Sequence, residues 1–283
     1  MQDKQVFITR SYDFASYFYG NGHHGFWYSQ FYGLKEFINE HLRSDFLKNL
    51  KKEVVLDVGC GNGFSSKIFK ELYPEVKKIV GIDISKKMLE RAVKELGKLF
   101  IPVYGDITDD NLWSSINTEF DGILSFFVLH WIDNSLLESV VSNIYNKLKQ
   151  SGWFIGAIFG KYELFPEFLS IIRDVIEIYG EIDNFEHILS IWNTENSSIL
   201  EKCLINANFK NIRLSSTITS KEYTVDEVVN IVFYRFGFWT QSIPVRSHSS
   251  AKQRLSEFLK EDLKPNKGYI TLREHILTWE SQK

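Results

Sequence analysis

The sequence has few features that tie a chain to one compartment or one kind of partner. It contains two cysteines, Cys60 and Cys203, which are too few for a disulfide framework and fit a reducing environment. The formal net charge is −3, so bulk electrostatics favour neither a nucleic acid nor a membrane surface as partner. No apolar run reaches the ~18 residues of a membrane span, and no basic-then-apolar signal segment opens the chain. We therefore expect a cytoplasmic protein with neither of these partners.

The composition is otherwise that of a folded globular protein, with aromatic residues concentrated near the start. Of the 283 residues, 44% are hydrophobic and 24% charged, enough to bury a full core. Aromatic residues are dense in the first 32 positions, where a glycine-containing loop at 20–25 separates a short helix at about 11–19 from a longer one at about 29–50. Such aromatics could only pack the segment against the main domain. We favour a helical lid over residues 1–50, because glycines beside large rings suit a hinge.

A strand, a glycine-rich turn and a helix follow the N-terminal segment. Val54–Val58 is aliphatic except for one Asp and reads as a strand buried on both faces. Gly59, Gly61 and Gly63 come next at alternating positions, and Phe64–Leu72 has helical spacing. Glycine lets the backbone approach a ligand closely, and the first N–H groups of a helix favour an anionic group. The stretch therefore predicts a nucleotide-type pocket.

The spacing of the turn distinguishes two ligand classes. A dinucleotide fingerprint needs a glycine where this chain has Phe64, which disfavours a nicotinamide cofactor. Instead Asp57 precedes the first of three glycines in the spacing G-x-G-x-G. In this stretch the chain resembles the class I S-adenosylmethionine-dependent methyltransferases. The resemblance implies S-adenosyl-L-methionine as cofactor, S-adenosyl-L-homocysteine as product, and Asp57 near the methionine part.

Two further acidic residues follow the next two predicted strands. Asp83 lies at a strand end where a carboxylate can accept hydrogen bonds from both ribose hydroxyls, with Ile84 beside it in the same cofactor set. The alternative is that Asp83 caps a helix, a role that Ser85 could also fill. The resemblance implies that Asp106 receives the adenine amino group and that Ile107 packs on the ring. Asp106 could instead be a turn residue.

A second distinctive stretch follows the fourth predicted strand, Phe120–Phe127. The strand carries Ser125 and Phe126 near its end, which we assign to the cofactor site, and is followed closely by His130-Trp131. This ending resembles the small-molecule branch of the family, namely juvenile hormone acid, trans-aconitate and malonyl-carrier-protein methyltransferases.

In that branch a Trp and an N-terminal Gln contact the substrate carboxylate. The resemblance therefore implies contact roles for Trp131 and Gln30, although the residues around Gln30 differ from those of the branch. His130 either acts as a general base or only positions Trp131, and both interpretations stay open. We predict His130, Trp131 and Gln30 as the catalytic group.

The resemblance also implies the fold. We expect an α/β Rossmann-like, doubly wound, seven-stranded, mostly parallel sheet whose last strand is antiparallel. Residues 51–283 would form this methyltransferase domain, with helical substrate-pocket insertions at about 161–208 and at about 224–262, before the last strand.

The functional hypothesis is methyl transfer from S-adenosylmethionine to a small, partly apolar acceptor, possibly a carboxylic acid that becomes a methyl ester. The alternatives are an N- or O-methyltransferase of an aromatic or natural-product metabolite and a non-catalytic S-adenosylmethionine-binding protein. No metal is expected, because His23-His24 lacks further spaced ligands. The sequence determines neither the acceptor nor the oligomeric state.

Overall fold

The computed structural model describes residues 34–162, 165–181, 196–235 and 242–283. The predicted hinge and Gln30 lie outside the described residues. The chain divides into two compact units. The sheet unit comprises residues 16–160, 195–217 and 276–283, and the helical unit comprises the remainder.

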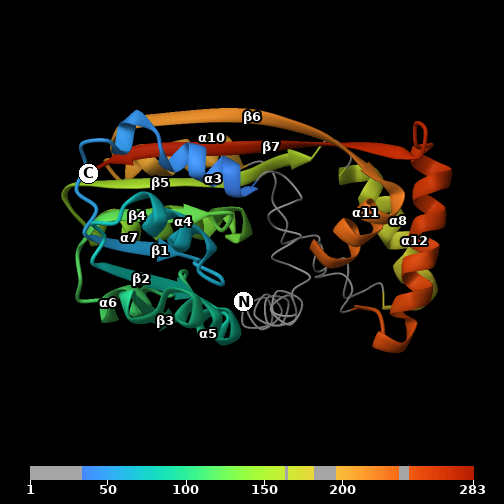
Figure 1. Ribbon diagram of the computed structural model, residues 1–283, viewed down its shortest axis with the longest axis horizontal. Coiled ribbons are helices and arrows are strands. Elements are labelled where there is room, and N and C mark those ends of the chain that lie inside the picture. Colours follow the sequence, from blue (N-terminus) through green and yellow to red (C-terminus); the bar gives the residue numbers. More distant parts are fainter. Residues whose placement is uncertain (1–33, 163–164, 182–195, 236–241) are drawn as a thin grey trace. The chain divides into compact units, whose positions relative to one another are not determined.

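A seven-stranded sheet has the strand order β3-β2-β1-β4-β5-β7-β6 (Figure 1). The strand bounds are β1 Val54–Val58, β2 Lys78–Asp83, β3 Phe100–Tyr104, β4 Phe120–Phe126, β5 Leu148–Tyr162, β6 Lys210–Thr224 and β7 Tyr269–Gln282. Strands β1 and β2, β2 and β3, β1 and β4, and β4 and β5 pair in parallel. The chain reverses direction of travel across the sheet between β1 and β4, so the predicted doubly wound topology is confirmed.

The last strand is antiparallel to β5, as predicted. The N–H of Lys283 donates to the carbonyl of Gly152 over 2.8 Å, and the Ser281 hydroxyl donates to the carbonyl of Phe154 over 3.2 Å. The partner on β5 therefore moves forward along the chain as β7 is followed backward. Figure 1 shows the arrowheads of these two strands at opposite ends.

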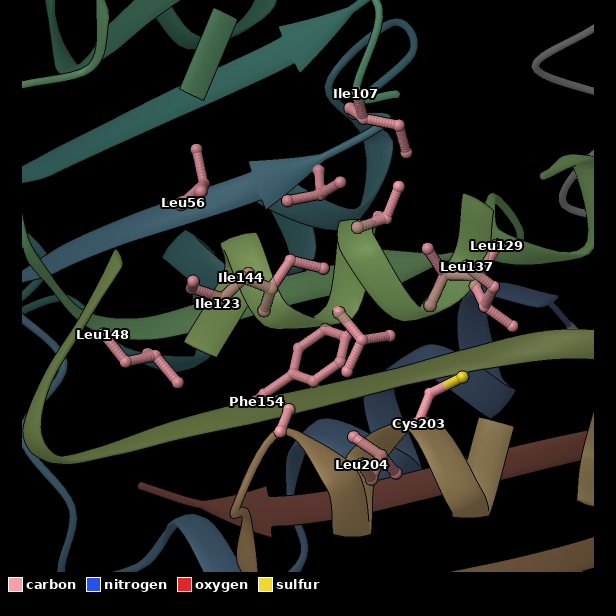
Figure 2. Packing of buried hydrophobic residues seen from close by; sticks show 14 of the residues in the cluster. Leu56, Ile107, Ile123, Leu129, Leu137, Ile144, Leu148, Phe154, Cys203 and Leu204 are labelled. Carbon is pink, nitrogen blue, oxygen red and sulfur yellow. The ribbon is translucent and has the colours of Figure 1, made fainter. Parts of the chain in front are cut away.

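Helices cover both faces of the sheet. Alternate residues of the central strands point to opposite faces, and because both sets are apolar, each face must be covered. Val55 belongs to a core with Ile38 and Ile68, whereas its neighbour Leu56 belongs to a core with Leu137. Figure 2 shows the second of these cores. The described helices of this unit are α3 Leu34–Leu42, α4 Phe64–Leu72, α5 Lys86–Leu96, α6 Asp110–Ser115, α7 Asn134–Lys147 and α10 Asn196–Asn206.

The helix predicted for residues 29–50 is shorter than expected at its end. Helix α3 stops at Leu42, and a 3-10 turn, η1 Asp45–Leu47, follows it. Ser44 between them has an extended backbone, with φ −56° and ψ 148°, which cannot continue a helix. Apolar residues continue at helical spacing past Leu42, so the sequence pattern did not predict the break.

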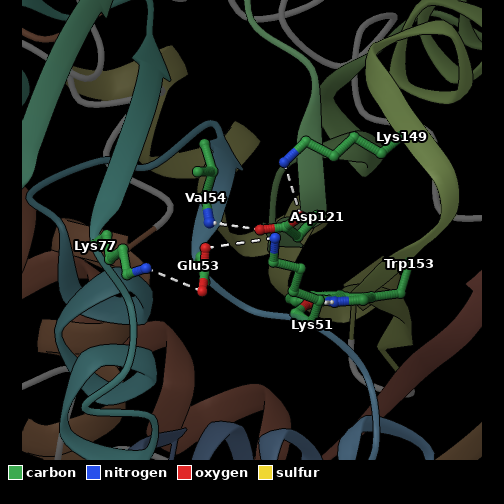
Figure 3. Close-up of polar contacts among 7 residues, drawn as sticks. All are labelled: Lys51, Glu53, Val54, Lys77, Asp121, Lys149 and Trp153. Atoms are coloured by element: carbon green, nitrogen blue, oxygen red, sulfur yellow. Dashed lines mark hydrogen bonds and ion pairs between the residues drawn. The ribbon is translucent and has the colours of Figure 1, made fainter.

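The strand beginnings are fastened by a polar network around Asp121 (Figure 3). One carboxylate oxygen accepts the N–H of Val54 at 2.8 Å, and the other pairs with the Lys149 ammonium at 2.8 Å. Trp153 donates its indole N–H to the carbonyl of Lys51. These contacts join β1, β4 and β5 at the edge opposite their carboxyl ends.

The helical unit contains α8 Phe165–Tyr179, α11 Val225–Asn230, the π-helix η4 Ile231–Arg235, the 3-10 turn η6 Val245–Ser247 and α12 His248–Leu263. Helix α12 packs against α8 and α11. Ala251, Leu255 and Leu259 recur at every fourth position and are buried. The helices predicted for the stretch 224–262 are thereby found. Within the part of the chain that the structure describes, no helix is long and apolar enough to cross a membrane.

Candidate active site

The three glycines after β1 all have positive φ, but only one borders open space. Gly59, Gly61 and Gly63 have φ values of 70°, 52° and 82°. A Cβ atom added to Gly59 would lie 2.2 Å from a methyl carbon of Val128, and one added to Gly63 would lie 3.0 Å from Leu96. Among the residues that the structure describes, a Cβ atom added to Gly61 would meet nothing within 4 Å. Packing explains the outer two glycines, whereas Gly61 leaves room for a ligand to reach the backbone.

Asp83 connects the end of β2 to this turn. Its buried carboxylate accepts the N–H of Gly61 at 2.8 Å on one oxygen and the N–H of Ser85 at 2.8 Å on the other. Ser85, whose hydroxyl accepts the N–H of Met88, is the residue that caps α5, so Asp83 is not the cap. A carboxylate oxygen can accept more than one hydrogen bond, so a carboxylate at this strand end suits the hydroxyl groups of a ribose. Ile84 beside it is half-buried.

Asp57 lies beneath the turn and is fully buried. One oxygen, Oδ2, accepts the hydroxyls of Ser65 and Ser66 at 2.7 and 2.6 Å, which fixes the start of α4. Burial raises the pKa of Asp57 to about 6, although the hydrogen bonds from Ser66 and Ser65 oppose this shift. The other oxygen, Oδ1, has no hydrogen-bond partner among the described residues. A buried acceptor without a donor is costly, and a cationic ligand group would satisfy it.

Asp106 and Ile107 lie at the same edge of the sheet. The N–H of Gly105, next to Asp106, donates to the carbonyl of Asp83 at 3.1 Å. Asp106 is half-buried, and its Oδ1 accepts the N–H of Thr108, so it also forms the turn that was the alternative interpretation. Ile107 is buried, and its carbonyl accepts the indole N–H of Trp113. The structure therefore brings the predicted ribose and adenine residues together.

The end of β4 supplies the next part of the site. Ser125 and Phe126 are buried, and the hydroxyl of Ser125 has no hydrogen-bond partner among the described residues. Phe127 follows with φ 61°, a conformation that is unusual for a bulky residue and often marks a functional site. This conformation could not be predicted, because no residue pattern in the stretch requires a positive φ. Gly59 packs on Val128, so the glycine turn and the end of β4 are neighbours.

His130 and Trp131 lie on a 3-10 turn, η3 Leu129–Trp131, directly after this strand. His130 is buried and Trp131 half-buried, with ring centroids 5.3 Å apart. The ring of Phe159, on β5, meets the imidazole edge-to-face at 5.5 Å. Phe159 was not among the predicted site residues, because it is far from His130 in the sequence and comes near it only when β5 pairs with β4. Gln30, the third predicted catalytic residue, lies outside the described residues.

Cys60, inside the glycine turn, is not a nucleophile. Its thiol is buried, and burial, with Asp83 and Asp57 nearby, raises its pKa well above the usual value. The turn therefore offers backbone groups and carboxylates, and no thiolate.

Comparison with known proteins agrees with this geometry. Residues 55–152 match the family described as "Methyltransferase domain". This stretch of the chain is therefore similar to a methyltransferase domain. The match runs from β1 to the start of β5 and so contains all the described predicted site residues. Similar folds have been solved with S-adenosylmethionine and with S-adenosylhomocysteine bound.

The relatives cover parts of the chain. Juvenile hormone acid O-methyltransferase of Drosophila melanogaster is 36% identical over 104 residues, 36% of this chain and 34% of that protein. The biotin biosynthesis bifunctional protein BioHC of Teredinibacter turnerae is 28% identical over 142 residues, 48% of this chain and 23% of that protein. The chain thus spans less than half the length of these relatives.

The fold extends further than the sequence likeness. The crystal structure of a putative methyltransferase from Bacillus halodurans aligns with a TM-score of 0.54 at 21% identity, covering 84% of this chain and 98% of that one. At this identity the likeness concerns the fold alone. The methyltransferase fold is thereby shared over most of the chain.

Proposed function

We propose that this protein transfers a methyl group from S-adenosylmethionine to a small, partly apolar acceptor, namely a carboxylic acid that becomes a methyl ester. The observation that carries the proposal is the open space at Gly61, bounded by the Asp83 carboxylate and next to the strand that leads to His130 and Trp131. A backbone cradle, a buried carboxylate and a ring-lined turn meet at one sheet edge. That combination suits a ligand with polar and cationic parts.

The chain offers a partner for each part of the cofactor. Asp83 and Ile84 would hold the ribose, and Asp106 and Ile107 the adenine. The unsatisfied oxygen of Asp57 favours a cationic group nearby, and the glycine turn allows close approach of the methionine part. Ser125 and Phe126 would close the site from β4. When bound, S-adenosylmethionine supplies an electrophilic methyl group, and the chain supplies placement and exclusion of water.

The acceptor end needs orientation more than activation if the acceptor is an acid. A carboxylate is already ionised at neutral pH and needs no general base. Trp131 would orient it through its indole N–H, and the buried imidazole of His130 would hold Trp131 through their ring contact. The likeness to juvenile hormone acid O-methyltransferase, whose name states acid methylation, supports this substrate class.

The test combines binding with product analysis. Isothermal titration with S-adenosylhomocysteine should show one saturable site. Incubation with S-adenosylmethionine and dodecanoic acid should give a product heavier by one methylene unit that mild base hydrolyses. Dodecan-1-ol serves as the matched acceptor without a carboxyl group. No binding of S-adenosylhomocysteine would refute the whole proposal, and a base-stable product would refute only the ester.

A second candidate is O- or N-methylation of an aromatic metabolite. The rings of Phe127, Phe159 and Trp131 favour it, because aromatic rings pack well on one another. Such an acceptor must lose a proton, and His130 would then act as base. Methylation of catechol, abolished in His130→Gln, would support this candidate. A non-catalytic binding protein would bind S-adenosylhomocysteine and turn over neither class.

We also propose a lid at residues 1–50 and acceptor-pocket helices at about 161–208 and 224–262. The half-buried Phe37 on α3, which lies 6.2 Å from the ring of Phe127, supports the first assignment, since it links that segment to the end of β4. Removal of residues 1–33 should raise KM for the acceptor at unchanged S-adenosylhomocysteine affinity. An unchanged KM would contradict the lid.

A further inference from the structure

The backbone at the end of β4 is held in an unfavourable conformation by its surroundings. Phe127 has φ 61°, which crowds the Cβ atom of any residue except glycine. The conformation is retained because both parts of the residue are fastened. Its N–H donates to the carbonyl of Ala157 at 2.7 Å, and its buried ring packs on Phe159 with centroids 4.3 Å apart. Strained residues that are overdetermined in this way cluster at functional sites.

The ring of Phe159 continues this packing to the imidazole. Its centroid lies 5.5 Å from that of His130, with the planes at 73°, an edge-to-face arrangement. The planes of Phe127 and Phe159 are inclined by 30°, so these two rings form a close, tilted pair. The edge-to-face contact of Phe159 with His130 is a preferred geometry for aromatic pairs. Phe127, Phe159 and His130 therefore form a continuous row of rings that joins β4, β5 and η3.

The imidazole gains support from this row of rings, because its own element is a turn of three residues. A three-residue 3-10 turn gives little rigidity to the side chains that it carries. Phe159 belongs instead to β5, a long strand paired with β4 in the middle of the sheet. A ring on this rigid element restricts which way the imidazole faces.

We propose that Phe159, supported by Phe127, is a positioning residue that holds the His130 imidazole in the orientation needed for methyl transfer. This inference rests on the proposed function. It assigns Phe159 no contact with the cofactor or with the transferred group. The row of rings acts through His130 on the transition state, and it leaves cofactor binding to the glycine turn and the carboxylates.

The test replaces the ring and then restores it. In Phe159→Leu we expect kcat with dodecanoic acid to fall about 2- to 10-fold, the range that one aromatic pair supports, with KM nearly unchanged. Phe159→Tyr keeps the ring and should keep kcat. Phe209→Leu is the matched control, since Phe209 is a buried ring packed against Phe154 in the same unit and outside the row. It should lower thermal stability and leave kcat unchanged.

Each other outcome overturns the inference. Wild-type kcat in Phe159→Leu, an equal loss in Phe159→Tyr, or a rise in KM at constant kcat would do so, the last because it means acceptor contact. The wild type could bind S-adenosylhomocysteine but methylate no acceptor. In that case urea unfolding of Phe159→Leu, His130→Gln and the double variant tests whether the two side chains interact. If the losses in the free energy of unfolding are additive, Phe159 and His130 do not interact and the inference is rejected. Failure of the wild type to bind S-adenosylhomocysteine would instead reject the proposed function.

Discussion

Neighbouring glycines in the turn after β1 serve different purposes. Gly59 and Gly63 have no space for a side chain, because Val128 and Leu96 occupy it. Gly61 has space, although its φ of 52° still disfavours a side chain. A substitution at Gly61 should therefore weaken ligand binding without preventing folding.

Gly61→Ala should therefore fold but bind S-adenosylhomocysteine at least about tenfold more weakly, because the added methyl group enters the space left for the ligand. The positive φ should lower the free energy of unfolding by about 1–2 kcal/mol. Gly97→Ala is the matched control, since its φ is 61° and an added Cβ atom also meets nothing within 4 Å. Calorimetric titration of both variants checks this. Equal affinity in the two would contradict a cofactor cradle at Gly61.

The single side chain of Asp57 should make the free energy of unfolding depend on pH. Its folded-state pKa of about 6 lies above the usual value of 3.8, so folding disfavours the ionised form by on the order of 3 kcal/mol. This penalty is present above pH 6 and disappears as the pH falls toward the unfolded-state value near ~3.9. Asp57→Asn does not titrate in this range.

The free energy of unfolding of the wild type, relative to Asp57→Asn, should thus rise as the pH is lowered from about 7 to about 4. Urea unfolding of both proteins across this range measures the difference. A difference that stays flat, or that falls with acidification, would show that the buried carboxyl is stabilised in its ionised form after all.

At the scale of elements, Asp121 fastens the beginnings of β1 and β4 (Figure 3). Burial alone would raise the pKa of this carboxyl, but the Lys149 ammonium and the N–H of Val54 outweigh it, so the pKa is lowered. The ionised form is therefore favoured in the folded state. Its contribution is present above the unfolded-state pKa of ~3.9 and is lost as the pH falls through the lowered folded-state pKa.

Asp121→Asn should lower the free energy of unfolding by about 1–3 kcal/mol at neutral pH, because a buried carboxylate loses its ion pair with the partly exposed Lys149 ammonium. The deficit should shrink in acid. Glu53→Gln is the control in the same network, since that side chain is more exposed and pairs with Lys51 and Lys77 at 3.4 and 3.0 Å. Its effect should be smaller than that of Asp121→Asn, because solvent screens exposed ion pairs. Urea unfolding compares the two, and equal losses would contradict a special role for the buried pair.

At the scale of the whole molecule, cofactor binding and stability are linked. A ligand that binds only the folded chain, at 100 times its Kd, stabilises it by about 2.7 kcal/mol. S-adenosylhomocysteine should produce this shift in the wild type and in Gly97→Ala, and a much smaller one in Gly61→Ala at the same concentration. Thermal unfolding with and without ligand measures it. An equal shift in all three proteins would place binding elsewhere.

The periodic elements could be predicted from the sequence because their signal is local. Strand β1 has the predicted bounds Val54–Val58, and β2 has the predicted bounds Lys78–Asp83, since buried parallel strands are short aliphatic runs. The break at Ser44 was missed, because Leu47 continues the apolar spacing after the helix has ended.

The sequence by itself predicted the fold class and the cofactor class through a family resemblance, which glycines and acidic residues at fixed distances from strand ends carry. Only the tertiary structure decided which glycine faces open space, that Asp57 is buried beneath the turn, and that Phe127 and Phe159 support His130. The physical reason is that these properties arise between residues on different strands. Strand pairing and burial bring such residues together, and no spacing along the chain records them.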